Sequence, residues 1–352
     1  MSSDWVAASV RAKAMARRRA GAGLCREAAA LGSLPQALGL FEQTGYGPEL
    51  IANPNTAPER TPARAAYAAA SGTEASLAAA QHATRRSVLW QLRVLAGWLP
   101  VSGARMVRAA GGVFELGNIT VLSRRLRDAE SAERDDPLRR RAALPEYFDL
   151  GGLATTWPRL ARAGTYSELV EALRTSPWGD PGTPQDLADT LTVVWLRRLA
   201  ASAPQTRRWM VAAAALLAAR RVLAVPGAQD TAGGRMEPGN PPEGNRLNTL
   251  LQPMIGTAWA EAQDVASFRA ALPAAAAGAL SGIEDPGELW RAEASLRAQA
   301  EEEAFALLRS GLPGPDIAVG AITVLAMDAW RVRAALAAAA AGGGSEVLDA
   351  VA

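Results

Sequence analysis

The sequence predicts an all-α protein. Hydrophobic residues make up 49% of the 352 residues, enough for a sizeable buried core, whereas aromatic residues contribute only 5%. Ala and Leu dominate and favour helices, while the residues that favour strands are sparse. Apolar residues also recur at helical spacing, as in the stripe Val88, Leu89, Leu92, Leu95 and Ala96.

The first part of the chain is expected to contain both long and short helices. Their expected positions are about 4–20, 25–30, a short stretch after Pro35, 73–99 and 113–127. Proline ends helices and charged runs stay solvated. A loop is therefore expected at 51–64, and a solvated linker or helix extension at 128–141.

The rest of the chain predicts the same kind of organisation. Helices are expected at about 153–163, 167–173, 185–201, 205–225, 248–262, 266–272, 286–308 and 317–341. The segment 226–243 is rich in Gly and Pro, which predicts a flexible loop. Three glycines from Gly342 to Gly344 are expected to end the last helix and begin a tail at 342–352.

Residues that occur only once limit the chemistry expected of this chain. Lys13 is the only lysine and lies outside any glycine-rich loop, so ATP hydrolysis through a Walker-type loop is not expected. His82, in a polar stretch expected to be exposed, is the only histidine, and Cys25 is the only cysteine. Zinc sites and Cys–His or Ser–His pairs need more such residues. We therefore predict a protein that is not an enzyme and uses no cofactor, metal ion or small-molecule substrate.

Charge and hydropathy give weaker indications. The net charge is +2, and arginine runs at 17–19, 124–125 and 139–141 are most simply solvated helix faces. The N-terminus is polar and charged, so no signal peptide is expected. The longest apolar run, Met210–Ala219, is about half of the roughly 20 residues that span a bilayer. A soluble chain without a transmembrane segment is the expectation.

The chain also shows an internal repeat with three blocks. We place the blocks at 1–145, 146–245 and 246–341, each with a short amphipathic helix and turn followed by two longer helices. The turn of the first block contains Phe41, Thr44 and Tyr46-Gly47. The second block aligns with it through a Leu followed six residues later by a Thr and then by an aromatic–Gly pair. Leu169 and Thr175 match Leu38 and Thr44, and Trp178-Gly179 matches Tyr46-Gly47.

A second similarity links the first and third blocks. Glu115 and Asn118 resemble Asp328 and Arg331, since in each pair an acid and a polar residue lie three positions apart on one helix face. A buried carboxylate needs partners, and we expect arginines on a neighbouring helix to supply them. The second block has Ala218 where the acid is expected.

These motifs, in this order, resemble the C/d-type central-stalk family of V/A-type ATPases. The segment Ala8–Met15 resembles the family's opening Tyr-x-Asn-Ala-Arg-Val-Arg-Ala-Met, and Phe41–Tyr46 its Leu-x-x-Thr-x-Tyr unit. Glu115–Ile119 resembles its Asp/Glu-x-x-Asn-Leu helix, and Asp328–Arg333 more loosely its Glu-x-x-Asn-x-Arg helix. The opening departs from the family at Ala-Ser-Val, and the second-block acid and third-block Thr-Tyr are missing.

The resemblance implies three similar helical lobes around a pseudo-threefold axis, shaped like a funnel. Such a protein is a non-catalytic central-stalk connector, peripheral on the cytoplasmic face of the membrane. It couples the central-shaft subunits of a rotary ATPase to the membrane proteolipid ring that transports protons or sodium ions. We predict that Phe41, Tyr46, Leu169 and Trp178 bind the shaft, and that Glu115, Asn118, Asp328 and Arg331 are structural residues of the repeat.

Three alternatives remain at this point. The chain could be an unrelated helical interaction scaffold, which needs no membrane complex. It could bind nucleic acid through its arginine runs, although the small net charge argues against this and no nucleic acid is expected as a partner. An enzyme using Glu301–Glu303 with Asp285 is a third alternative, but successive helix residues point in different directions, so we expect that run on the solvated surface.

Overall fold

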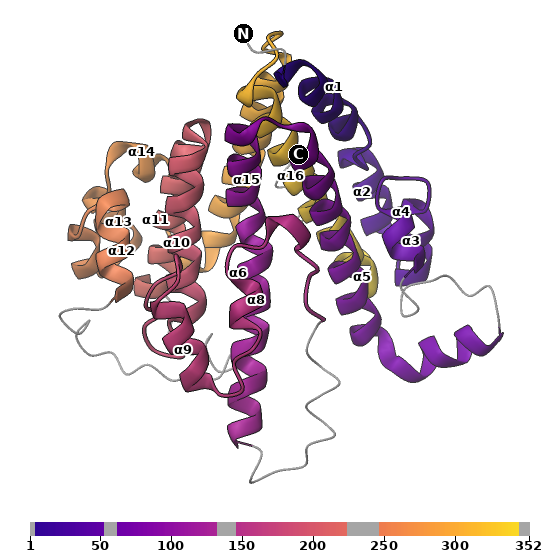
Figure 1. Ribbon diagram of the computed structural model, residues 1–352, viewed down its shortest axis with the longest axis horizontal. Coiled ribbons are helices and arrows are strands. Elements are labelled where there is room, and N and C mark those ends of the chain that lie inside the picture. The colour runs from indigo at the N-terminus through magenta and orange to yellow at the C-terminus, as the bar shows by residue number, and fades with distance from the viewer. Residues whose placement is uncertain (1–3, 53–61, 132–145, 224–245, 345–352) are drawn as a thin grey trace. The chain divides into compact units, whose positions relative to one another are not determined.

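The computed structural model describes residues 4–52, 62–131, 146–223 and 246–344. Helices account for most of these residues and no strand occurs among them, so the predicted all-α class is confirmed. The chain divides into two units, each assembled from separate chain segments (Figure 1). Unit 1 consists of Met1–Gly111, Arg134–Leu153 and Ala298–Ala352, and unit 2 of Gly112–Glu133 and Ala154–Arg297.

Unit 1 is organised around its last helix. Its elements are α1 (Asp4–Arg17), α2 (Gly21–Ala30), α3 (Leu34–Phe41), α4 (Gly47–Ala52), α5 (Pro62–Trp98), the start of α6 (Val101–Ser131), η2 (Gly151–Leu153), the end of α15 (Leu289–Arg309) and α16 (Pro315–Ala340). Helix α16 packs against α1, α2, α3 and α5. Five consecutive residues from Ile317 to Ala321 are buried, so this helix is covered on all sides over its first turns.

Small residues allow the helices of unit 1 to approach closely. A Cβ atom on Gly320 of α16 would lie 2.6 Å from the carbonyl oxygen of Ala304 on α15. Any larger residue at position 320 would push the two helices apart. The Ala-rich composition that predicted helices therefore also sets their close spacing.

Unit 2 contains the remaining helices. Its elements are the end of α6, α8 (Trp157–Leu160), α9 (Tyr166–Arg174), α10 (Leu187–Ser202), η3 (Pro204–Thr206), α11 (Arg207–Leu223), α12 (Arg246–Ile255), η4 (Ala258–Glu261), α13 (Val265–Ala271), α14 (Ala274–Ala277), η5 (Gly278–Leu280), η6 (Pro286–Glu288) and the start of α15. Helices α10 and α11 pack against each other and against α12, and α11 also contacts α13 and α14. The core is formed by aliphatic residues of α10 and α11 such as Leu191, Val193 and Leu216.

Local hydrogen bonds explain where two of the short helices begin. The hydroxyl of Thr165 accepts a hydrogen bond from the Glu168 amide at the start of α9. At the start of α13, Asp264 accepts one from the Ser267 amide, and the Ser267 hydroxyl accepts one from the Asp264 amide. Such reciprocal caps satisfy amide groups that the first turn of a helix leaves free.

Two predicted helix starts were too late in the sequence. Helix α5 begins at Pro62 rather than near 73, and α6 begins at Val101 rather than near 113. Glycines lower helix propensity, but Gly103, Gly111 and Gly112 of α6 lie where other groups pack closely. A Cβ atom on Gly111 would lie 3.2 Å from the side chain of Leu153. Packing thus compensates for the unfavourable propensity.

The longest apolar run of the sequence is part of a core helix. Met210–Ala219 lies within α11, where Ala214, Ala215 and Leu216 are buried. Across the described ranges, no helix combines the length and hydropathy needed to cross a membrane.

Several predictions lie wholly or partly outside the described residues. They are the loop at 226–243, most of the loop at 51–64, most of the segment at 128–141, and the tail beyond Gly344. The predicted lobes 1–145, 146–245 and 246–341 remain a prediction, since the two units are made of different, discontinuous segments.

Candidate functional site

The carboxylate of Asp328 holds the start of a helix in unit 1. It lies on α16 with no exposed surface and accepts hydrogen bonds from the amides of Ala20 and Gly21, each 2.8 Å long. These amides begin α2, where the free N–H groups and the helix dipole favour a negative charge. Burial raises the pKa of Asp328, while the hydrogen bonds from Gly21, Ala20 and Tyr46 oppose that shift.

The third partner of Asp328 is the aromatic residue of a tight turn. The Tyr46 hydroxyl donates a 2.8 Å hydrogen bond to Asp328, and burial, followed by the charge of Asp328, raises the Tyr46 pKa well above its usual value. In the turn before it, the Thr44 hydroxyl donates to the carbonyl of Phe41 and accepts from the Tyr46 amide. Gly47 closes the turn, where a Cβ atom would clash with the Glu42 carbonyl oxygen.

Unit 2 contains a similar carboxylate on a different helix. Glu115 of α6 is 1% exposed and accepts hydrogen bonds from the amides of Thr155 and Thr156, at 3.0 and 2.6 Å. The Thr156 hydroxyl donates a third hydrogen bond of 2.6 Å. Thr156 is the residue before α8, so this carboxylate also holds a helix start.

The same kind of tight turn follows the short helices of unit 2. The Ser176 hydroxyl donates to the carbonyl of Leu173 and accepts from the amide of Trp178. Trp178 is 1% exposed, and its ring lies 3.9 Å from the position of a Cβ atom on Gly112, one turn before Glu115 on α6. The aromatic residue of the turn therefore packs against the helix that carries the acid.

The two arrangements correspond step by step along the chain. In each, a buried acid on a long helix binds the start of a short helix, a second short helix follows, and a Ser or Thr hydroxyl shapes the turn before a buried aromatic residue. This contact pattern pairs Thr44 with Ser176 and Phe41 with Leu173. The sequence alignment of Thr44 with Thr175 was therefore wrong by one residue.

The prediction that arginine side chains donate hydrogen bonds to the two acids was also wrong. Backbone amides and hydroxyl groups donate to Glu115 and Asp328, where arginine side chains were expected. Arg331 instead makes a bidentate ion pair with Glu301 of α15. Arg331 and Glu301 are 6% and 8% exposed. The expectation that Glu301 lies on the solvated surface is therefore incorrect.

The helical spacing of α15 could have identified Glu301. Ala294 and Ala304 lie seven residues before and three residues after it, and both are buried. These spacings place all three residues on one face of a helix. Asn118, predicted as a structural residue, is 1% exposed on α6, so both partners of the Glu115–Asn118 pair are core residues.

The side chains predicted to bind a shaft lie in the core. Phe41, Tyr46, Leu169 and Trp178 are each at most 1% exposed. A partner approaching these turns would meet their exposed neighbours, such as Gln43, Arg174 and Thr175. The four side chains are therefore covered by the fold, and the shaft contact predicted for them stays a prediction.

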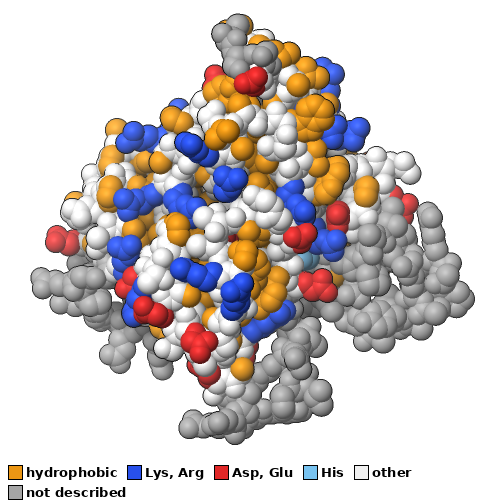
Figure 2. All heavy atoms as spheres, in the orientation of Figure 1, with side chains coloured by type: hydrophobic (Ala, Val, Ile, Leu, Met, Phe, Trp, Pro, Cys, Tyr) orange, Lys and Arg blue, Asp and Glu red, His pale blue; other side chains and the backbone are white. Residues whose placement is uncertain are grey.

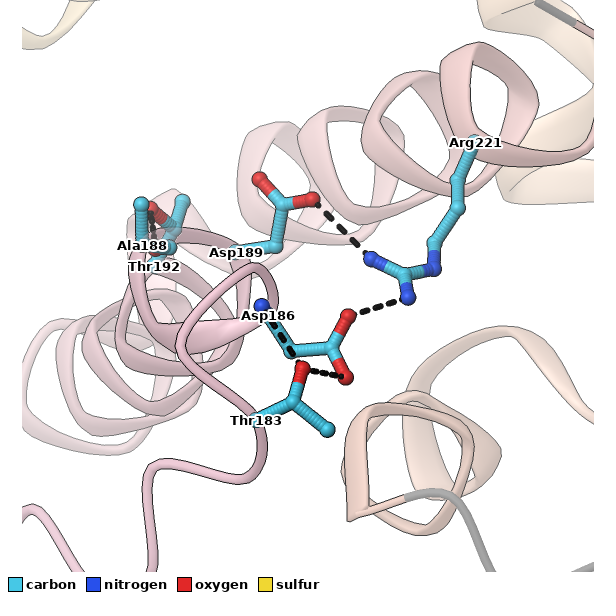
Figure 3. A network of polar contacts seen from close by, with 6 residues as sticks. All are labelled: Thr183, Asp186, Ala188, Asp189, Thr192 and Arg221. Carbon is cyan, nitrogen blue, oxygen red and sulfur yellow. Dashed lines mark hydrogen bonds and ion pairs between the residues drawn. The ribbon is translucent and has the colours of Figure 1, made fainter. Parts of the chain in front are cut away.

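A polar network of different composition lies between α10 and α11 (Figure 3). Arg221 donates to the carboxylate of Asp186 and lies 3.4 Å from that of Asp189. The Thr183 hydroxyl donates a 2.8 Å hydrogen bond to Asp186. Ala218, at the position where the repeat lacks its acid, is fully buried one turn before Arg221.

His82 and Cys25 lie within unit 1, where His82 is half-buried and Cys25 fully buried, each with charged groups nearby. The ring of His82 stacks on Phe148 with 4.3 Å between centroids, so the expected exposure of this histidine was incorrect. Burial, together with Arg85 and Arg86, lowers the pKa of His82 to about 4. Burial and the nearby Asp328 raise the pKa of Cys25 to about 12.

The described residues hold no group of three or more His, Cys, Asp or Glu side chains placed to bind a metal ion. The distinctive feature of the described residues is that a buried carboxylate, Asp328 or Glu115, binds the start of a short helix in each unit. No protein-family model matches the chain, and no curated protein matches it at a significant level.

Proposed function

We propose that this chain is a non-catalytic connector of a V/A-type rotary ATPase. In this proposal it lies peripherally on the cytoplasmic face of the membrane and couples the central-shaft subunits to the proteolipid ring during proton or sodium transport. The observation that supports it is the repeated arrangement around Asp328 and Glu115. These acids, and the turns ending at Tyr46 and Trp178, belong to the motifs whose order resembles the C/d-type central-stalk family.

The repeat supports the proposal because a coupling around a shaft needs similar surfaces on several sides. Two copies of the capped turn occur among the described residues, one in each unit, on α16 and α6. A third copy would follow α11, where Ala218 replaces the acid and Trp259 and Phe268 make an edge-to-face contact. Three lobes around a pseudo-threefold axis are the finer architecture that we infer from this series.

Mechanical stiffness is the property that such a connector requires. Packed helical interiors deform little, and a carboxylate that binds two adjacent amides fixes a helix start in position. Each cap also joins segments that are far apart in the sequence, since Asp328 and Gly21 are separated by 307 positions. Load applied at one turn is thereby passed to a long helix rather than absorbed by a loop.

The surface of the turns is where we expect the shaft to bind. Arg174, Thr175 and Pro177 are exposed around the buried Trp178, and Gln43 is exposed beside Phe41. Binding through these residues leaves the core intact. A test can therefore change the surface without removing the side chains that hold the turn.

The experiment is a pull-down of purified ATPase shaft subunits by the full chain. The variant Gln43→Glu/Arg174→Glu adds one negative charge and reverses one positive charge, so it should capture about tenfold less shaft. Arg197→Glu, at an exposed position of α10 outside all three copies of the repeat, serves as the matched control. Failure of the wild-type chain to capture shaft or ring subunits would reject the proposal and favour an unrelated helical scaffold.

The nucleic-acid alternative is tested in the same preparation. Binding through arginine runs would fall steeply as salt rises. A titration of duplex DNA and single-stranded RNA at low and high salt should show no such binding if the connector proposal is correct.

A further inference from the structure

Large exposed hydrophobic side chains gather at one end of unit 1. Among the described residues, seven large hydrophobic side chains are exposed: Val6, Val10, Trp90, Trp98, Val101, Trp290 and Leu312. Five of them lie in three segments, which are α1, the α5–α6 turn and the α15–α16 turn. We call Val6, Val10, Trp98, Val101 and Leu312 the apolar tip. Their exposed fractions range from 49% for Val6 to 71% for Val101.

Contacts within unit 1 bring these three segments together. A Cβ atom on Gly103 of α6 would lie 2.8 Å from the Trp5 ring, so α1 packs directly on the α5–α6 turn. The Ser9 hydroxyl accepts a 3.2 Å hydrogen bond from the amide of Gly314, which joins α1 to the α15–α16 turn. Figure 1 shows all three segments at the same end of the unit.

Trp5 and Ser9 hold the segments together while their neighbours face outward. Ser9 is 4% exposed, whereas Val6 and Val10, on another face of α1, are 49% and 66% exposed. In Figure 2 apolar side chains are visible at this end of the unit, as over much of the same face, with basic and acidic side chains among them. Single exposed apolar residues are common on protein surfaces, whereas several gathered in one place are typical of an interaction site.

The charge around the apolar tip is positive. The stretches 4–17, 98–108 and 309–316 contain six basic residues, Arg11, Lys13, Arg17, Arg105, Arg108 and Arg309, and two acidic ones, Asp4 and Asp316. Both acids lie in the first turn of a helix, where the helix dipole attracts them. Arg105, Arg108 and Arg309 are exposed within two turns of Val101 or Leu312.

We propose that the apolar tip inserts shallowly into an anionic lipid bilayer. Tryptophan favours the boundary between lipid headgroups and acyl chains, where Trp98 would lie beside Val101 and Leu312. Arginines one or two turns behind the tip would then meet phosphate and carboxylate headgroups. The tip combines one face of α1 with the α5–α6 and α15–α16 turns. This proposal does not depend on the proposed function as a rotary connector.

The test is co-sedimentation of the full chain with lipid vesicles. One set contains phosphatidylcholine alone and the other phosphatidylcholine with phosphatidylserine, each at low and high salt. We expect binding to the anionic vesicles to exceed binding to the neutral ones, and to weaken as salt rises. Equal absence of binding to both vesicles would overturn the proposal.

Two variants and a matched control separate the apolar and basic contributions. The triple variant Trp98→Ser/Val101→Ser/Leu312→Ser should bind anionic vesicles at least about tenfold more weakly, since three buried apolar contacts are lost. The control Trp90→Ser/Trp290→Ser removes exposed tryptophans outside the tip and should bind like the wild type. All changed residues are exposed, and circular dichroism would check that each variant folds.

The basic contribution is tested by Arg105→Gln/Arg309→Gln. This variant should lose several-fold in binding to anionic vesicles and keep its weak binding to neutral ones. Sedimentation velocity without lipid examines the other occupant, a second copy of the chain. If the wild type self-associates and the triple variant does not, the tip is a protein interface and the proposal fails. Shaft capture is measured independently, so failure of one proposal does not imply failure of the other.

Discussion

The Tyr46 hydroxyl donates its hydrogen bond to Asp328, a residue 282 positions further along the chain. The same carboxylate accepts the amides of Ala20 and Gly21, so one side chain of α16 joins the start of α2 to the turn after α3. Both groups are fully or almost fully buried. In an apolar interior, removing one member of such a network leaves the others without partners, which costs more than the net value of the bonds.

Replacing the carboxylate should therefore destabilise unit 1 strongly. We expect Asp328→Ala to lower the free energy of unfolding by about 3 kcal/mol, because two amides and a phenol lose their acceptor. Tyr46→Phe removes only one donor and should cost about 1 kcal/mol. Urea denaturation of both single variants and the double variant measures their coupling. Additive effects would show that the hydrogen bond contributes nothing.

The pair of Arg331 and Glu301 provides a second test of buried polar contacts. Arg331→Met leaves a buried carboxylate unpaired, and we expect a loss of about 3–5 kcal/mol. Arg291 makes a similar contact with Glu288, but its side chain is 57% exposed. Arg291→Met should change stability by less than about 1 kcal/mol. Similar losses in the two variants would contradict the role assigned to burial.

The thiol of Cys25 should be unreactive while the protein is folded. It has no exposed surface, and its pKa is raised to about 12, so little thiolate is present at pH 8. Labelling with a disulfide reagent such as dithionitrobenzoate should be at least about a thousandfold slower in buffer than in guanidinium. Rapid labelling under native conditions would show that α2 opens readily from α16.

The histidine gives a pH dependence with a defined sign. The pKa of His82 is lowered to about 4 in the folded protein, from 6.5 ordinarily. Well above pH 6.5 the residue is neutral in both the folded and the unfolded chain, so its titration does not reduce the free energy of unfolding there. As pH falls from about 6.5 to about 4, the unfolded chain takes up the proton first, so stability decreases.

The control for this prediction is His82→Phe, which keeps an aromatic ring against Phe148 but does not titrate. The midpoint of thermal unfolding, recorded between pH 4 and 7, should fall less steeply for the variant than for the wild type. Identical slopes would place the pH dependence on other groups.

Much of the fold could be predicted from the sequence because helices leave a local signal. Composition, apolar spacing and Pro or Gly breaks predicted the class and most helices, including α9 and α16. The start of α6 was missed because packing around residues such as Gly111 outweighs their low propensity. Spacing along one chain segment carries no information on such tertiary contacts.

The candidate site could be predicted only in part, because its contacts join segments that are far apart in the sequence. Glu115 and Asp328 were identified as related residues from their neighbours, but their partners come from remote segments. Thr175 and Ser176 both donate to the carbonyl three residues earlier, but only Ser176 also accepts the amide two residues later, as Thr44 does. Only the turn geometry distinguishes them.

The interleaved order of the two units has a consequence for biosynthesis. Helix α16 is translated after α1, α2, α3 and α5, yet all four pack against it. The acceptor for the amides of Ala20 and Gly21 is thus translated 308 and 307 positions after them. Unit 2, which ends at Arg297, can complete its own helices earlier. During synthesis, α1, α2, α3 and α5 therefore expose their apolar faces until α16 has been made. We expect these helices to be the part of the nascent chain that a chaperone binds.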